Sequence, residues 1–116
     1  MHIRDIMMVG TLNQIRAACT DKRQLYAWYL PDRDFPVEKE HYTHLGMEFW
    51  KDRVAYTPVQ YAIMSKRINA LPILVEHDAS FFKRPRFSGI TSLHLAVDTG
   101  DLPIVKFIVE TSFHGK

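Results

Sequence analysis

Apolar residues recur with helical spacing in the C-terminal third of the chain. Leu93, Ala96 and Val97 follow the i, i+3, i+4 spacing of one helix face, and Thr91 stands where it can cap the first turn. Gly100 is expected to end this helix. A second helix is predicted directly after it. Its start signals are Asp101 and Pro103, and its apolar face consists of Ile104, Val105, Ile108 and Val109. The pattern therefore predicts two short antiparallel helices.

The same pattern occurs earlier in the chain at a fixed distance. Residues 57–63, TPVQYAI, align with residues 91–97, TSLHLAV, at an offset of 34, and the agreement continues through residues 71–76 and 105–110. A weaker third copy surrounds Gly10, which lies 56 residues before its counterpart Lys66, so an insertion is expected between the first two copies. Because one helix pair has no core of its own, we expect the three pairs to stack.

These residues resemble the ankyrin repeat, whose pattern is T-P-L-H-x-A-A followed by G-H-x-E-I-V-x-L-L-L-E. The resemblance implies an all-α helical solenoid of about three ankyrin repeats, with short hairpin fingers and a long insertion after the first. We expect a single domain over 1–116, divided into repeat 1 (about 1–20), an insertion (21–51), repeat 2 (52–85) and repeat 3 (86–116). The middle copy has Lys66 and Asp78 where the family usually has turn glycines.

The insertion is rich in aromatic residues and fits no repeat. Leu25, Trp28 and Tyr29 predict a helical turn that Pro31 should end, and Leu45 with Phe49 indicates a second short helix. The segment is too apolar for a solvated linker, so we expect it to pack on the stacked helices.

Composition and charge narrow the functional class only slightly. Fifteen Lys and Arg residues against thirteen Asp and Glu residues give a net charge of +2, too small to select a partner by long-range attraction. The single cysteine and the absence of a visible signal peptide favour a cytoplasmic protein, and no stretch is apolar enough to span a membrane.

No residue pattern indicates catalysis, a cofactor or a metal, so we expect a protein that is not an enzyme. His41, His44 and Glu48 would share a helix face in the insertion, a spacing that can hold zinc. We favour the interpretation that the two histidines are ordinary side chains on a solvent-facing helix. His94 occupies the place of the family's histidine, which ties neighbouring turns together by hydrogen bonds. Cys19 is expected to be a small buried apolar residue.

A basic and aromatic run lies between the last two repeats, where the family projects a hairpin finger. It contains Phe82, Lys83, Arg84, Arg86 and Phe87. Three interpretations stay open: a solvated hairpin tip, a contact for an acidic protein, or binding of nucleic acid, with nuclear import as a variant of the last.

The resemblance implies a non-catalytic module that binds another protein through its concave face and fingers. The alternatives are nucleic-acid or acidic-ligand binding through the basic finger 83–86 and a metal site in the insertion. The sequence by itself favours no oligomeric state. Carried over by position, the expected partner-binding residues are Arg53, Val54, Tyr56, Met64, Ser65, Phe82, Lys83, Arg84, Arg86, Phe87, Ser88, Ile90, Asp98 and Thr99.

Overall fold

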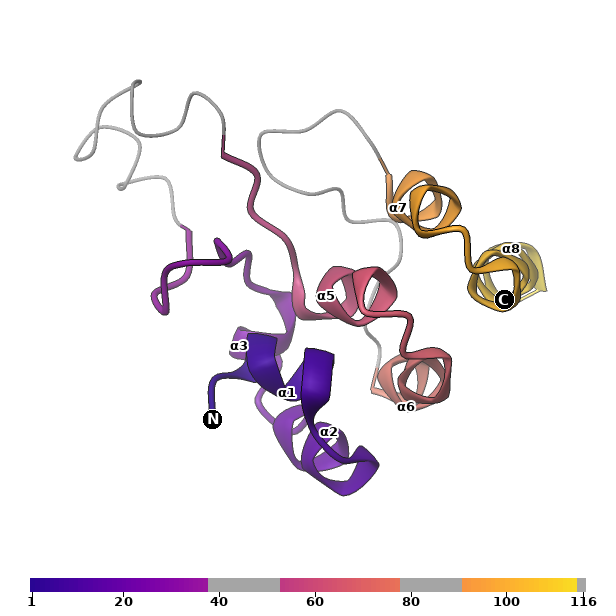
Figure 1. Ribbon diagram of the computed structural model, residues 1–116. Helices are drawn as coiled ribbons and strands as arrows, with labels where there is room; N and C mark the ends of the chain where they lie inside the picture. The colour runs from indigo at the N-terminus through magenta and orange to yellow at the C-terminus, as the bar shows by residue number, and fades with distance from the viewer. Residues whose placement is uncertain (38–52, 78–90, 115–116) are drawn as a thin grey trace.

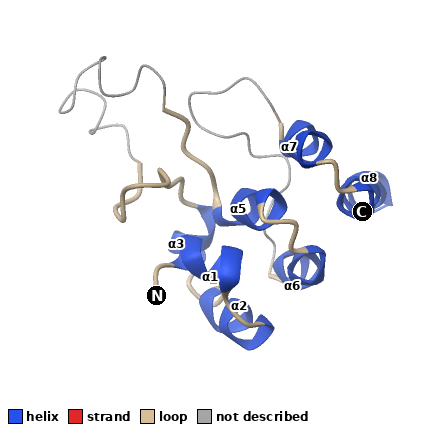
Figure 2. Ribbon diagram, in the orientation of Figure 1, coloured by secondary structure: helices blue, strands red, loops and turns tan. Residues whose placement is uncertain are grey.

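The computed structural model describes residues 1–37, 53–77 and 91–114. In these ranges the regular elements are helices, joined by loops (Figure 2). They are α1 (Ile3–Val9), α2 (Leu12–Ala18), α3 (Lys22–Tyr26), α5 (Pro58–Met64), the 3-10 helix η1 (Ile68–Ala70), α6 (Leu71–Glu76), α7 (Ser92–Thr99) and α8 (Leu102–His114). The expected all-α class is confirmed for this part of the chain. None of these helices combines the length and apolarity needed to cross a bilayer.

Three helix pairs lie side by side in two rows (Figure 1). Helices α1, α5 and α7 form the first row, in which α5 packs against both neighbours. Helices α2, α6 and α8 form the second row. A single apolar cluster includes side chains from every pair, such as Met7, Ile63 and Ile104, each 0% exposed. Since these short pairs share one core, each depends on its neighbours for most of its stability.

The turn signals at the third pair act as expected. The Thr91 hydroxyl accepts a hydrogen bond from the His94 amide at 3.2 Å, and Asp101 Oδ1 accepts one from the Ile104 amide at 3.3 Å. Gly100 ends α7 in the left-handed conformation with φ of 74°. These signals could be predicted because each is complete within a few residues of sequence.

The apolar face predicted for α7 is wrong in part. Ala96 is fully buried, but Leu93 and Val97 are 39% and 59% exposed, and the buried positions beside Ala96 are Ser92 and Leu95. On α8, Ile104 and Ile108 are buried as expected, whereas the other two predicted positions, Val105 and Val109, are only half-buried. The difference arises because the third pair has a neighbour on one side only among the described residues.

Lys66 occupies the turn of the second pair in a conformation that favours glycine. Its φ of 58° lies in the same left-handed region as the φ of 74° at Gly100, so the turn forms without the glycine. We expect Lys66→Gly to raise the free energy of unfolding by about 0.5–1 kcal/mol, because a side chain is strained in this region. Urea unfolding measures this, with Gly100→Ala as the reverse control. A lower midpoint for Lys66→Gly would contradict the assignment.

The first part of the insertion packs on the helix pairs. Leu25 in α3 belongs to the main apolar cluster, whereas Leu30, Val37 and Ala55 form a second small cluster beside Trp28. The expected packing on the stacked helices is therefore confirmed for Leu25 and Tyr29 and the residues between them that contact the main cluster, Tyr26 and Ala27. The expected helical turn is shorter than predicted, because α3 ends at Tyr26 and leaves Trp28 and Tyr29 outside it. The second short helix, expected around Leu45 and Phe49, lies outside the described residues.

Candidate partner-binding surface

The segment leading into α5 pairs with the insertion. Tyr29 and Tyr56 form an antiparallel bridge, in which the amide of each donates to the carbonyl of the other at 2.8 and 2.9 Å. The buried Tyr61 hydroxyl of α5 donates to the Tyr29 carbonyl at 2.6 Å, and burial raises the pKa of this hydroxyl. The Tyr61 and Tyr56 rings meet edge to face, with their centroids 5.5 Å apart. The bridge is thus fixed to the first row of helices.

An open hollow lies where these two segments meet. We name it the junction hollow and define it by its lining residues: Leu30, Pro31, Asp32, Arg53, Val54 and Tyr56. Three of these, Arg53, Val54 and Tyr56, were expected from sequence to bind a partner, and each of them is half-buried. The structure therefore brings the first part of the expected surface together in one place.

An ion pair lies at the edge of the junction hollow. Arg53 Nη1 is 2.9 Å from both Asp32 Oδ1 and Oδ2. The hydrogen bond from Arg53 holds the pKa of the Asp32 carboxyl below its ordinary value, so this carboxyl is charged at neutral pH. The hollow therefore presents one fixed acid and one fixed base beside the apolar surfaces of Val54 and Tyr56.

A buried arginine holds the insertion loop that lines one side of the hollow. Arg4 in α1 donates to the carbonyls of Leu30 and Arg33 at 2.9 and 2.6 Å, and to Asp34 Oδ1 at 2.9 Å. Its side chain is 9% exposed, whereas that of Asp34 is 80% exposed. Arg4 thereby fixes the loop that carries Asp32 to the first helix of the stack.

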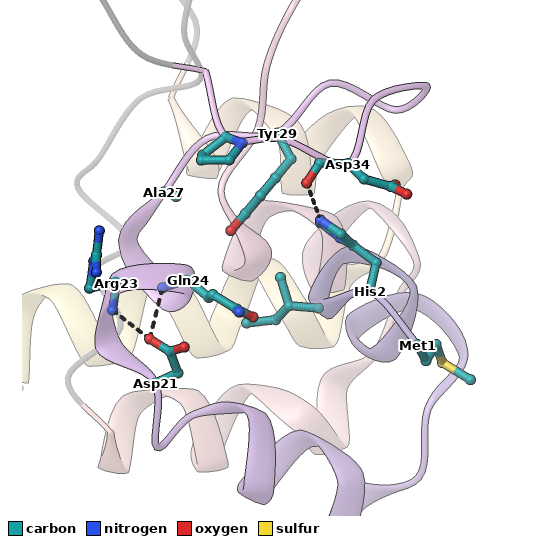
Figure 3. Close-up of a pocket in the computed structure, with 10 residues that line it drawn as sticks. Met1, His2, Asp21, Arg23, Gln24, Ala27, Tyr29 and Asp34 are labelled. Atoms are coloured by element: carbon teal, nitrogen blue, oxygen red, sulfur yellow. Dashed lines mark hydrogen bonds between the residues drawn. The ribbon is translucent and has the colours of Figure 1, made fainter.

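A second cleft is lined by the N-terminus and the first part of the insertion, including His2, Asp21 and Asp34 (Figure 3). His2 Nε2 is 2.8 Å from the Asp34 carbonyl oxygen, and its ring meets Tyr29 edge to face at 4.6 Å between centroids. Asp21 Oδ1 accepts hydrogen bonds from the amides of Arg23 and Gln24, which caps α3. The His2 ring and the Asp21 carboxylate of this cleft are thus engaged in holding the first part of the insertion.

The other described positions of the expected surface lie at the opposite ends of their helices. Met64 and Ser65 are half-buried at the end of α5, and Asp98 and Thr99 lie at the end of α7. Asp98 is exposed, whereas the Thr99 hydroxyl donates to the Ala96 carbonyl at 2.7 Å. Since α5 spans seven residues, Met64 lies about 10 Å along the helix from the junction hollow.

The rest of the expected surface belongs to residues 78–90 and lies outside the described ranges. These positions are Phe82, Lys83, Arg84, Arg86, Phe87, Ser88 and Ile90. The histidine pair of the insertion, His41 and His44, also falls outside them. In the part of the chain that the structure describes, no group of three His, Cys, Asp or Glu side chains is arranged to hold a metal ion.

Two residues that the sequence singled out have local structural roles. Cys19 is fully buried, and its burial raises the pKa of the thiol, as expected for an apolar core position. His94 Nδ1 accepts a hydrogen bond from the Thr91 amide at 3.2 Å, so it closes the cap of its own helix. The contact between neighbouring pairs comes instead from Gln60 at the equivalent position of α5, whose Nε2 donates to Ser92 Oγ at 3.5 Å.

The sequence did not reveal half of the junction hollow. Leu30, Pro31 and Asp32 belong to the insertion, which has no repeat register from which their position could be inferred. The only available signal was the aromatic content of this segment, which predicted packing but no partner segment. Their side of the hollow depends on a pairing between residues 27 positions apart, Tyr29 and Tyr56.

Comparison of the chain with models of known protein families, with curated proteins and with solved structures gives no match.

Proposed function

We propose that the chain is a small ankyrin-type solenoid of three repeats with an insertion after the first. The 34-residue offset between α5 and α7 supports this proposal, as do the left-handed turns at Lys66 and Gly100 that follow these two helices. The side-by-side arrangement of three helix pairs agrees with it (Figure 1). The insertion then replaces the neighbouring finger as the partner of the segment leading into α5.

We infer that this solenoid is a non-catalytic module that binds another protein. The observation that carries the inference is the junction hollow, in which a fixed ion pair borders apolar side chains on a rigid support. A peptide segment with one apolar side chain and one charged group would find both an apolar contact and a charged partner there. Because Arg4 and the Tyr29–Tyr56 bridge hold the hollow in place, binding would require little ordering of this surface.

The proposed binding surface extends beyond the junction hollow. The exposed Asp98 and the positions at the ends of α5 and α7 would extend the contact along the first row of helices. The basic finger 83–86, for which a contact with an acidic protein is one of the interpretations left open, would extend it further. The location proposed is the reducing cytoplasm, because a chain whose single cysteine, Cys19, can form no internal disulfide suits that compartment.

A charged substitution in the junction hollow should weaken partner binding selectively. Val54→Glu places a carboxylate beside Asp32 on the apolar part of the hollow, so we expect at least tenfold weaker binding. The half-buried site should keep the melting temperature within about 2 °C of the wild type. Val9→Glu is the control with the same substitution, because Val9 is 74% exposed at the end of α1 and outside the hollow.

The measurement begins with the immobilised wild type and both variants in a cell lysate. A protein retained by the wild type and by Val9→Glu, but lost from Val54→Glu, is then purified and its affinity for all three is measured by surface plasmon resonance. If every retained protein binds Val54→Glu as tightly as the wild type, the junction hollow is not the binding surface.

A further inference from the structure

The outer face of the third helix pair carries a row of exposed apolar side chains. Leu93 and Val97 of α7 are 39% and 59% exposed, and Leu102 at the start of α8 is 76% exposed. Val105 and Val109 continue the row along α8 and are half-buried. We name these five residues the end face. Exposed apolar surface of this kind usually marks a site that another molecule covers.

The repeat register shows that the α7 part of this face is of a type that the other pairs bury. Leu93 and Val97 correspond at the 34-residue offset to Val59 and Ile63 of α5, which are 2% and 0% exposed. The same positions of α1, Ile3 and Met7, are also buried, at 3% and 0% exposed. In the first two pairs the next pair packs alongside, whereas α7 and α8 stand at the end of the described stack (Figure 1).

The opposite end of the stack differs in character. Leu95 and Ile104 are buried where the third pair meets the second, but Asp5 and Gln14 occupy these register positions in the first pair. Asp5 is half-buried and Gln14 is exposed. This polar end cannot cover an apolar face without burying a carboxylate, which makes head-to-tail stacking of two copies unfavourable.

The charges beside the end face are arranged so that the face can pair with itself. Lys106 and Glu110 lie one turn apart on α8, with Nζ and Oε1 separated by 4.0 Å, and both line the shallow groove that contains Leu102, Val105 and Val109. If two α8 helices met in antiparallel orientation around a two-fold axis, Lys106 of each copy would face Glu110 of the other. Apolar contacts would then be flanked by two opposite-charge pairs.

We propose that the end face is a homodimer interface, in which a second copy of this chain packs tail to tail through α8. The dimer covers Leu102 and Val109 and the other apolar residues of the end face, and it leaves the junction hollow of both copies free. The proposal is independent of the proposed function, because it concerns a different surface and requires no further partner.

Sedimentation equilibrium of the purified chain over a range of concentrations tests this interface. The wild-type mass should rise with concentration from 13.6 kDa toward twice that value. Leu102→Asp should weaken dimerisation at least tenfold, while Val9→Asp should leave it unchanged. The two sites are matched, with exposures of 76% and 74%, and melting curves verify that both variants fold.

Charge reversal supplies the second part of the test. Lys106→Glu and Glu110→Lys should each weaken the dimer, because each places like charges opposite one another across the two-fold axis. The double variant should restore it, since the opposite-charge pairs reform with exchanged positions. A mass that stays at 13.6 kDa at every concentration would overturn the proposal, as would a double variant that dimerises no better than the two single variants.

Discussion

Arg4→Ala should destabilise the chain by about 2–4 kcal/mol. Arg4 donates to two carbonyls and one carboxylate of the insertion, and the Leu30 carbonyl that it serves is buried. The substitution leaves these acceptors without their donor and opens a cavity beside α1. For a chain of this length, the loss corresponds to a fall of roughly 10 °C or more in melting temperature.

Two further variants separate the hydrogen bonds of Arg4 from its volume. Arg4→Met keeps much of the apolar stem but no donor, so it should remain close to Arg4→Ala if the hydrogen bonds dominate. Arg16→Ala removes an exposed arginine from α2 and should change the unfolding free energy by less than about 0.5 kcal/mol. Equal midpoints for Arg4→Ala and Arg16→Ala would show that Arg4 does not anchor the insertion.

Ala96→Leu should destabilise the chain by about 1–3 kcal/mol. Ala96 is fully buried on α7, which packs against α5, and three additional carbon atoms there would push the two helices apart. Urea unfolding gives the size of the effect. Unchanged stability would mean that the second and third pairs are not closely packed at this position.

Ala17→Leu provides the matched control for this overpacking. The same change is made on a helix, but Ala17 is exposed on α2 and has room for the larger side chain. We expect its unfolding free energy to stay within about 0.5 kcal/mol of the wild type. A comparable loss at both positions would indicate a general effect of leucine rather than the close approach of α5 and α7.

Features of the fold that are local in sequence could be predicted, and those that depend on distant neighbours could not. The caps at Thr91 and Asp101 and the turn at Gly100 are each complete within four residues. The inward face of α7 was assigned to Leu93 and Val97 because their spacing with Ala96 is helical. Leu95 is inward instead, since α5 lies on its side of the helix, and spacing alone does not specify that side.

The candidate site shows the same limit more clearly. Arg53, Val54 and Tyr56 could be named because they hold fixed positions relative to the repeat that begins at Thr57. The position of Asp32, which lines the other side of the hollow, could not be predicted, because it depends on Arg4, which lies 28 residues earlier. Nothing in the sequence around Arg4 indicates a buried hydrogen-bond donor. An arginine is most often exposed, so only the folded structure identifies this one as an anchor.

Amide hydrogen exchange tests most directly whether the junction hollow is the surface that binds a partner protein. The exchange rates of the chain are compared with and without the protein captured by the wild type and lost from Val54→Glu. We expect slower exchange at Asp32, Arg53 and Val54, with no change along α2 and α6. Protection confined to the second row of helices, with Asp32, Arg53 and Val54 unchanged, would contradict it.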